Sequence, residues 1–331
     1  MSITIKDVAK EAGVSVATVS RVLNGSCNVS DESTKKVNET IARLNYSPNF
    51  LGRNLRKCET NVILVIMPTS EHSLYSKIVM GMQEYAGKVG YDIITAVSYS
   101  TSTAETRQMN MLFNRTVDGV ILLGTQYDAD SLNKLAENYN VALCCEGVKG
   151  ANVLTVAVDD EQAAFDAVAA LIKKGHKRIG FIGTNSAAIS STARENGYIR
   201  ALKEYGIAIK NEYIYKESYD YDCGGRAFEY FNALDEKPTA IFAVSDLLAI
   251  SAMHKAIDMG IDVGKDVAIM GFDNISMCEW IIPTLSTVEQ PCSKMGELVV
   301  AKLIENMNKT TKDNHYYTVD HRIILRESTG D

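Results

Sequence analysis

The hydrophobic and polar positions of residues 1–47 follow the spacing of short helices. Apolar residues recur every three or four positions in three successive stretches, and each stretch follows a residue that can cap a helix: Thr4, Ser15 and Ser30. Gly13 separates the first stretch from the second. This pattern predicts three short helices with a glycine turn between the first two, which is the organisation of a helix-turn-helix unit.

The second predicted helix has two different sides. Its spacing places Val19, Val22 and Leu23 on the inward side. The outward side carries small, polar and basic residues, namely Val16, Ala17, Thr18, Ser20 and Arg21. An ordinary three-helix subdomain explains the inward side alone. A helix that enters the major groove of DNA explains both sides, so the sequence favours a DNA-binding unit.

From residue 61 onward the pattern changes to short apolar runs that alternate with helical stretches. The runs typical of buried strands cover 61–68, 91–97, 119–124, 141–145, 154–158, 178–183, 239–244 and 266–272. Helices are expected from Ser102, where STAE has the pattern of a capping box, and over 161–174, 192–205 and 246–259. Repeated βα units predict parallel sheets covered on both faces. Because the pattern restarts at 178–183, it predicts two similar lobes.

The charge of the chain is unevenly distributed. Residues 1–58 contain nine Lys and Arg residues against five acidic ones, a net charge of +4 in a chain whose total is −7, which leaves −11 for the remainder. A basic head on an acidic body indicates a polyanionic partner for the head alone. A solvated surface with chance clustering is the alternative that charge by itself leaves open.

Several classes of protein are disfavoured by what the sequence lacks. A chain of 331 residues favours two or three domains. No apolar run reaches about 18 residues and the N-terminus has no signal-peptide pattern, so we expect no membrane association. Seven cysteines without a CxxC pair indicate a reducing cytoplasm. With no P-loop, GxSxG, HExxH or GxGxxG motif, we expect neither an enzyme nor a bound cofactor or metal.

Longer segments of the chain resemble one known family. The segments TIKDVAKEAGVSVATVSRVLNG, LNYSPN, NFLGRNLRK, VDGVILLG, GHKRIGFIG, MGFDN and HRIILREST are similar to the LacI/GalR family of bacterial repressors. The resemblance covers essentially the whole chain. VSVATVSRV, DEQAAFDAV and EKPTAIF are especially similar to the catabolite control protein A branch of this family.

The resemblance implies a fold and a domain organisation. An N-terminal all-α helix-turn-helix headpiece (1–47) and a hinge helix (48–58) would precede an α/β core (59–331) for effector binding and dimerisation. The core would have two periplasmic-binding-protein-like lobes with Rossmann-like parallel sheets. The first lobe would comprise about 59–159 and 291–319, and the second about 160–290 and 320–331.

The resemblance also assigns DNA contacts. Val16, Ala17 and Arg21 would face base edges. Phosphates would be held by Thr4, Ser15, Thr18, Ser20, Asn24, Ser30, Tyr46 and Asn49, whose types are good phosphate partners. Leu55 would insert into the minor groove and kink the duplex. Gly52 stands where the family usually has alanine, and glycine costs about 1 kcal/mol in a helix interior. We therefore expect the hinge helix to form less readily without DNA.

Candidate effector contacts follow the predicted strands. Asp273, Glu146 and Ser245 come at strand ends, where ligands bind in open α/β folds. The family resemblance assigns effector contacts to Arg194 and Asp273 and a position along the cleft to Tyr219, while Tyr75 begins the first predicted helix of the first lobe. A purely structural role is the alternative that stays open for four of the candidates: Glu146, Ser245, Tyr219 and Tyr75. Carboxylate and guanidinium groups can hydrogen-bond hydroxyls, while tyrosine stacks on a sugar ring, so a sugar or sugar phosphate is the expected ligand. Asp159 and Asp160 are expected to cap the following helix.

Two other functions are open at this stage. A transporter's solute-binding protein would use the same core, but it would need a signal peptide and no headpiece, and the sequence pattern disfavours it on both points. A catabolite control regulator would respond to a phosphorylated phosphocarrier protein. At the family's positions for that contact, this chain has Ser293, Lys294 and Ala301, with Lys302 next along. These departures favour a small sugar effector. We therefore predict a homodimeric repressor that binds a pseudo-palindromic DNA operator.

Overall fold

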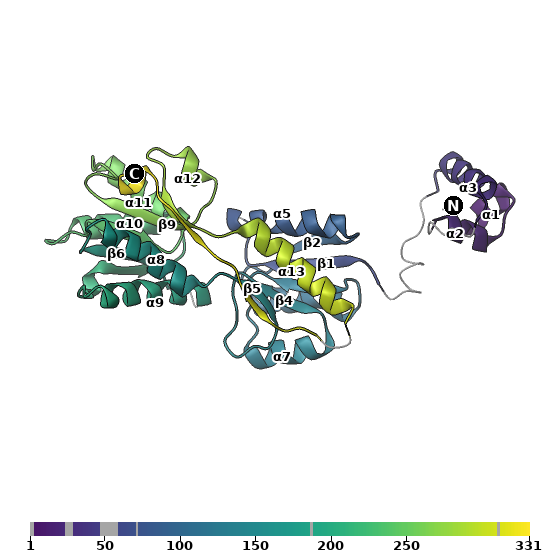
Figure 1. Cartoon of the computed structure of the whole chain (residues 1–331), viewed down its shortest axis with the longest axis horizontal. Helices are drawn as coiled ribbons and strands as arrows, with labels where there is room; N and C mark the ends of the chain where they lie inside the picture. Colours follow the sequence, from purple (N-terminus) through teal and green to yellow (C-terminus); the bar gives the residue numbers. More distant parts are fainter. Residues whose placement is uncertain (1–2, 24–28, 47–58, 71, 186–187, 310–311) are drawn as a thin grey trace. The chain divides into compact units, whose positions relative to one another are not determined.

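The computed structural model describes residues 3–23, 29–46, 59–70, 72–185, 188–309 and 312–331. The chain divides into two compact units, Met1–Thr60 and Asn61–Asp331 (Figure 1). The predicted hinge helix 48–58, including Gly52 and Leu55, lies outside the described residues. The same holds for Asn24 and Asn49, two of the predicted phosphate contacts.

The first unit contains the three predicted helices, which are α1 Ile5–Ala12, α2 Val16–Leu23 and α3 Asp31–Leu44. Ser15 caps α2, since its Oγ accepts a hydrogen bond from the amide of Thr18 at 3.1 Å. Ser30 likewise caps α3. Gly13 ends α1 at φ 67°, a left-handed conformation that glycine adopts without steric cost. The predicted helix-turn-helix organisation is confirmed.

A small apolar core joins these helices. Val8, Ala9, Val19 and Val37 are buried, and half-buried apolar residues of all three helices pack around them. Val22 and Leu23 belong to this second group, so the predicted inward side of α2 is confirmed.

The first lobe of the second unit is built on a six-stranded parallel sheet. Its strands are β1 Val62–Met67, β2 Asp92–Val97, β3 Gly119–Leu122, β4 Val141–Cys144, β5 Leu154–Ala157 and β11 Tyr316–Thr318. They lie in the order β11-β5-β4-β3-β1-β2. Helices α5 Ser73–Lys88 and α13 Cys292–Met307 cover one face, and α6 Ser102–Phe113 and α7 Ala129–Asn138 cover the other (Figure 1).

The second lobe repeats this architecture. Its strands are β6 Ile179–Thr184, β7 Ile214–Glu217, β8 Ala240–Ala243, β9 Ala268–Asp273, β10 Ser286–Glu289 and β12 Arg322–Ile324. They lie in the order β12-β10-β9-β8-β6-β7, and β12 alone among the described strands runs antiparallel to its neighbour. Two α/β lobes with parallel sheets confirm the predicted fold class.

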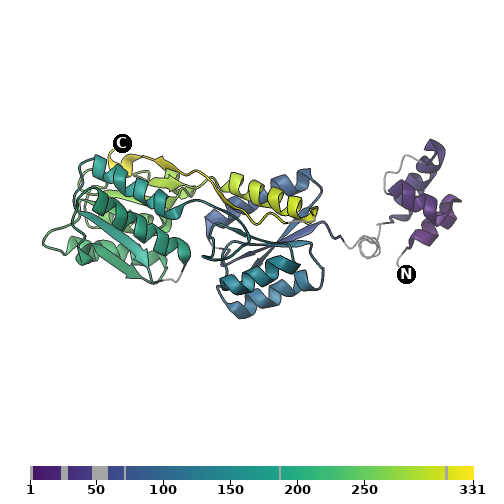
Figure 2. The same ribbon diagram turned by 60° about the horizontal axis from the view of Figure 1, so that its bottom comes forward.

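Helices pack in pairs on the second sheet. The pairs are α8 Asp160–Lys173 with α9 Ile189–Glu204, and α10 Tyr221–Asn232 with α11 Asp246–Asp258. Figure 2 shows the teal helices α8 and α9 side by side against their sheet. Shorter elements are α12 Met277–Trp280 and the 3₁₀ helices η1 Asn211–Tyr213 and η2 Glu327–Thr329.

Three segments connect the lobes. The chain passes from β5 to α8, from β10 to α13, and from β11 to β12 (Figure 1). Since each passage joins elements of different lobes, the ends of these elements converge on the space between the two sheets. None of the described helices is long and apolar enough to cross a membrane.

The structure corrects two local predictions. Helix α6 begins at Ser102 as expected, but Thr101 is its cap, and Glu105 does not bond back to the helix start. The Glu105 carboxylate instead accepts hydrogen bonds from Thr125 and Gln126. The apolar pattern also fails to predict β10, because its buried positions include hydroxyl residues, such as Ser286, whose partners are distant in sequence.

Candidate functional site

The outward side of α2 is accessible in the first unit. Val16 is 42% exposed, Ala17 and Arg21 are exposed as well, and Thr18 and Ser20 are half-buried. Arginine can donate two hydrogen bonds to a guanine edge, and small apolar groups can contact the thymine methyl. This side of α2 therefore has the chemistry of a base-reading surface.

The predicted phosphate contacts in the described residues have local structural roles. The Thr4 hydroxyl donates to Asp7 Oδ2 at 2.7 Å, and Ser15 and Ser30 cap helices. Tyr46 packs against the small apolar core. Capping residues lie at helix N-termini, whose free amides and positive dipole end suit a phosphate. Their contact with DNA stays a prediction.

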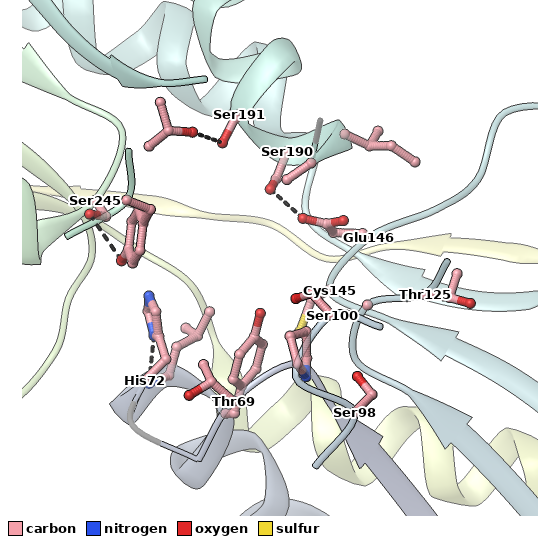
Figure 3. Close-up of a pocket in the computed structure, with 18 of the residues that line it drawn as sticks. Thr69, His72, Ser98, Ser100, Thr125, Cys145, Glu146, Ser190, Ser191 and Ser245 are labelled. Atoms are coloured by element: carbon pink, nitrogen blue, oxygen red, sulfur yellow. Dashed lines mark hydrogen bonds between the residues drawn. The ribbon is translucent and has the colours of Figure 1, made fainter. Parts of the chain in front are cut away.

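A cleft of about 610 Å³ lies between the lobes of the second unit. All six predicted effector residues line this cleft, although they come from separate elements of both lobes: Tyr75, Glu146, Arg194, Tyr219, Ser245 and Asp273. Figure 3 shows polar side chains from the two lobes facing the same space, among them Ser98, Thr125 and Glu146 from one lobe and Ser190 and Ser245 from the other. The ends of the strands thus form a single polar site.

Arg194, on α9, is buried and held on several sides. Its Nε donates to Asp160 Oδ1 at 2.8 Å, and its Nη1 donates to the carbonyl oxygen of Val244 at 2.6 Å. The guanidinium carbon lies 3.7 Å from the centre of the Phe272 ring, within cation–π range. Burial acts to lower the pKa of Arg194, but the carboxylates of Asp160 and Asp273 raise it above its ordinary value. Arg194 is therefore permanently charged.

The structure gives Asp159 and Asp160 different roles, although the sequence predicts that both cap α8. Asp159 does cap α8, since it accepts a hydrogen bond from the amide of Gln162. Asp160 does not share this role, because it is 7% exposed and points toward Arg194. Burial raises the pKa of Asp160 to about 6, although the nearby guanidinium acts in the opposite direction. The expectation that both aspartates are caps is wrong for Asp160.

Gly197 explains how α9 comes close enough to α8 for this pair to form. A Cβ atom at this position would lie 2.2 Å from the carbonyl oxygen of Glu161 on α8. Only glycine fits such a close helix contact. One turn of α9 before Gly197, Arg194 is then directed at Asp160.

Asp273, at the end of β9, contacts residues of both lobes. It is 2% exposed, and its Oδ1 accepts a hydrogen bond from Gln290 at 2.7 Å. Arg194 Nη1 and His72 Nε2 each lie 3.6 Å from its carboxylate, and His72 belongs to the first lobe. Its backbone has φ 117°, a region that non-glycine residues rarely adopt. Such strain commonly marks functional sites.

Two further hydrogen bonds join the lobes. The Ser190 hydroxyl, on α9, donates to the carboxylate of Glu146, which follows β4 (Figure 3). Lys77 Nζ, on α5, donates to the carbonyl oxygen of Asn274 at 2.7 Å. A ligand that displaces such contacts changes the balance between open and closed lobes.

Aromatic rings line the same cleft. His72 stacks on Tyr219, with ring centroids 6.1 Å apart, and is tilted against Tyr75 at 5.4 Å. The Tyr219 hydroxyl donates to Ser245 Oγ at 3.3 Å, while Ser245 also caps α11. Burial raises the pKa of Tyr75 well above its ordinary value, so its phenol stays protonated. These rings give the cleft flat apolar surfaces between its polar groups.

Sequence reasoning did not assign many of the residues that line the cleft, among them three with acidic, imidazole or amide side chains. His72, Gln290 and Glu105 all line it. Gln290 directly precedes Pro291 at a lobe crossing, a position that could have marked it. The sequence around Glu105 has the pattern of a capping box, so it indicated a role at the helix start. His72 belongs to no motif that indicates a binding site. In the described part of the chain, no group of three or more His, Cys, Asp or Glu residues is arranged to hold a metal ion.

Comparison with known proteins agrees with this geometry. Residues 4–49 match the model for bacterial regulatory proteins of the lacI family, and residues 168–329 match a periplasmic binding protein-like domain. The chain is 38% identical to catabolite control protein A of Priestia megaterium over 331 residues, which cover 99% of this chain and 100% of that protein.

Two solved structures resemble the chain over nearly its full length. One is the Lac repressor dimer bound to operator and the anti-inducer ONPF, with a TM-score of 0.90, 23% identity and 99% coverage of both chains. The other is the transcriptional regulator CelR in complex with cellobiose, with a TM-score of 0.73, 27% identity and coverage of 98% and 99%.

A helix-turn-helix unit combined with two lobes around a polar cleft defines a ligand-controlled DNA-binding regulator. This chain belongs to the LacI family of bacterial regulatory proteins and is a transcriptional regulator. The family resemblance found in the sequence is confirmed.

Proposed function

We propose that this regulator is a homodimeric repressor of a carbohydrate-utilisation operon, and that a sugar-type effector bound between its lobes controls its affinity for a pseudo-palindromic operator. The observation that carries the proposal is the cleft, where six residues from both lobes converge on about 610 Å³. A ligand that contacts both lobes at once favours one of their arrangements over the other.

The groups in the cleft suit a polyhydroxylated ligand. Asp273 can accept hydrogen bonds from ligand hydroxyls, and Arg194 can donate to their oxygens. Tyr219, which is 43% exposed, and Tyr75 offer ring faces for stacking on a pyranose. The structure of the regulator CelR with cellobiose supports this class of ligand.

Coupling to DNA is proposed to act through the arrangement of the lobes. Ser190–Glu146 and His72–Asp273 both join the lobes across the cleft, so an effector there competes with them or strengthens them. The resulting change in DNA affinity should correspond to about 1–3 kcal/mol, as is typical of allosteric coupling.

The DNA contacts remain as predicted from the sequence. We propose that Val16, Ala17 and Arg21 read base edges, and that Thr4, Ser15, Thr18, Ser20, Asn24, Ser30, Tyr46 and Asn49 hold phosphates. We further propose that 1–47 acts as the headpiece, that 48–58 is the hinge helix, and that Leu55 inserts into the minor groove.

The test compares the full chain with a chain that begins at Asn61. Fluorescence anisotropy with a family-type palindrome should give tight binding for the full chain, which weakens steeply with salt because several phosphates are neutralised. The shorter chain should remain folded and dimeric but lose operator binding. Operator binding by the shorter chain would contradict the assignment of the DNA contact to residues 1–60.

A catabolite control regulator that responds to a phosphorylated phosphocarrier protein is the alternative function. The relative from Priestia megaterium favours it by similarity. Against it, Ala301 offers no charge, and Lys302 is paired with Glu305 at 3.0 Å and lies over the ring of Tyr317. Binding of a serine-phosphorylated phosphocarrier protein, measured by calorimetry, would decide between the two.

A further inference from the structure

The charges in the cleft are not balanced. In the described lining of the cleft and of the adjoining cavity of about 320 Å³, Arg194 is the single Lys or Arg side chain. Six acidic residues line the same two spaces: Glu105, Glu146, Asp159, Asp160, Glu161 and Asp273. The two cavities share Glu146 and Ser190, so they meet at the hydrogen bond between these residues.

Four of the six carboxylates are satisfied within the protein. Asp159 caps α8, and Glu105 accepts hydrogen bonds from Thr125 and Gln126. Glu161 is paired with Arg200 at 2.6 Å, and Asp160 with Arg194 at 2.8 Å. These acids do not need a ligand to balance them.

The other two carboxylates of the cleft, those of Glu146 and Asp273, are less fully balanced by groups of the protein. Asp273 lies 3.6 Å from a guanidinium that already pairs with Asp160, and the imidazole of His72 lies at the same distance. Glu146 accepts a hydrogen bond from Ser190, and its carboxylate helps to raise the pKa of Arg194. That guanidinium is already paired with Asp160, so Glu146 has no ion pair of its own within the described residues. A partly desolvated carboxylate without a cation is costly, and a charged donor on a ligand would relieve that cost.

We infer that the cleft takes a hydroxylated ligand that carries a basic amine beside Glu146, and that it rejects phosphorylated sugars. The inference rests on the proposed effector function and narrows its ligand class. Hydroxyl groups contact Asp273, Arg194 and the aromatic rings. The ammonium group replaces the Ser190 hydroxyl as a donor to Glu146. A phosphate in the same space would face two carboxylates with one shared guanidinium.

The probes are sets of ligands that share a sugar skeleton and differ in their charged substituents. One set is glucose, glucosamine and glucose 6-phosphate, a second has the galactose configuration, and a third pairs cellobiose with the glucosamine disaccharide. Dissociation constants are measured by calorimetry on the full chain. In at least one set the amine should bind at least about tenfold tighter than its neutral counterpart, as expected for a charge-assisted hydrogen bond. Each phosphate should bind more weakly than its neutral counterpart.

Glu146→Gln keeps the size and hydrogen-bonding capacity of the side chain and removes its charge. In this variant the advantage of the amine should fall below about threefold, while the neutral sugar changes by less than about twofold. Glu84→Gln is the matched control, because Glu84 is exposed on α5 and paired with Lys88 outside the cleft. It should leave the ratio unchanged.

Three results would overturn the inference. These are a phosphate that binds as tightly as the neutral sugar, the absence of an amine advantage in every set, and an advantage that survives in Glu146→Gln. Operator binding with and without each ligand is measured in parallel. If a neutral sugar or a phosphate changes operator affinity, the proposed effector function stands and only its charge class is wrong. If no ligand of any class does so, effector control by these sugars is wrong as well.

Discussion

Arg194 and Asp160 form a buried ion pair between neighbouring helices of the second lobe, with 2.8 Å between Nε and Oδ1. Both side chains are about nine-tenths buried. The pair ties a predicted effector residue to the protein's own framework. Arg194 therefore contributes to the stability of the lobe as well as to the surface of the cleft, and a substitution there alters both.

Arg194→Ala should lower the free energy of unfolding by about 3–5 kcal/mol, because it leaves Asp160 buried without its counter-ion. Asp160→Asn in the same chain should recover part of this loss. The control is Arg200→Ala on the same helix, whose ion pair with Glu161 is about one-third exposed and should contribute less than about 1 kcal/mol. Urea denaturation of the four chains measures the difference. Equal losses in the two alanine variants would show that the buried pair has no special role.

Gly197→Ala should move α9 away from α8. Its Cβ would lie 2.2 Å from the backbone oxygen of Glu161, so the helices must separate, at a cost of about 1–3 kcal/mol. Gly87→Ala is the matched control, because a Cβ at this exposed position in α5 meets nothing within 4 Å. It should be neutral or stabilising by up to about 1 kcal/mol. Thermal unfolding followed by circular dichroism distinguishes them, and a stable Gly197→Ala chain would contradict the close contact.

Asp273→Asn should separate effector sensing from DNA binding. Asparagine keeps the side-chain shape and tolerates a positive φ better than alanine does, so the fold should be preserved. Loss of the charged acceptor should weaken effector affinity by at least about tenfold, while operator affinity without effector stays within about twofold.

The direction of the response then follows from the type of effector. If the effector is an inducer, the Asp273→Asn variant should repress permanently. If the effector is a co-repressor, the variant should bind the operator weakly at all times. Titration of operator binding with and without effector measures this. Asp222→Asn, an exposed change on α10, is the control and should respond like the unmodified chain. A full response in Asp273→Asn would remove this residue from the site.

Asp246 should make stability depend on pH. It is fully buried, and burial together with the carboxylate of Asp273 raises its pKa to about 7. In the unfolded chain the pKa is about 3.9. Between these values the folded state holds a proton that the unfolded state lacks, so the free energy of unfolding falls as pH rises from about 4 to about 7.

The slope from this one proton is at most about 1.4 kcal/mol per pH unit. Asp160, with its pKa of about 6, acts in the same direction. Asp246→Asn should therefore flatten the pH dependence without abolishing it, as measured by urea denaturation at pH 5, 6, 7 and 8. Asp258→Asn, exposed at the end of the same helix, should keep the original slope. An unchanged slope in Asp246→Asn would show that Asp246 is ionised throughout this range.

Arg21→Ala should weaken operator binding by about 1–3 kcal/mol and relax the preference at one base pair, as expected for an arginine that contacts a guanine edge. Arg43 is the matched control, since it is exposed in the same unit but paired with Glu11 at 3.0 Å. Arg43→Ala should have a smaller effect that is equal on operator and unrelated DNA. Anisotropy titrations against both DNAs make the comparison, and equal losses for Arg21→Ala on both would contradict base reading.

Local sequence patterns determined much of this protein. The helix caps Ser15 and Ser30, the turn at Gly13 and the apolar strand runs could be predicted because each depends on residues close together in the chain. Strand ends pointed to Asp273, Glu146 and Ser245, and the family resemblance pointed to Arg194, Asp273 and Tyr219, all of which line the cleft. The convergence of Asp273, Glu146 and Ser245 follows from the rule that ligands bind at the carboxyl ends of parallel strands.

Only the tertiary structure decided which partners the polar groups take. Asp160 and Glu105 both occur in sequence patterns typical of helix caps, yet each bonds to a residue of another element. Glu146 meets Ser190, and His72 meets Asp273, across a boundary between lobes. These pairs are separated by many residues, and their formation depends on helix approach at Gly197 and on the three crossings of the chain. Local periodicity predicts which face of an element is buried, but it does not predict which distant charged residue that face will contact.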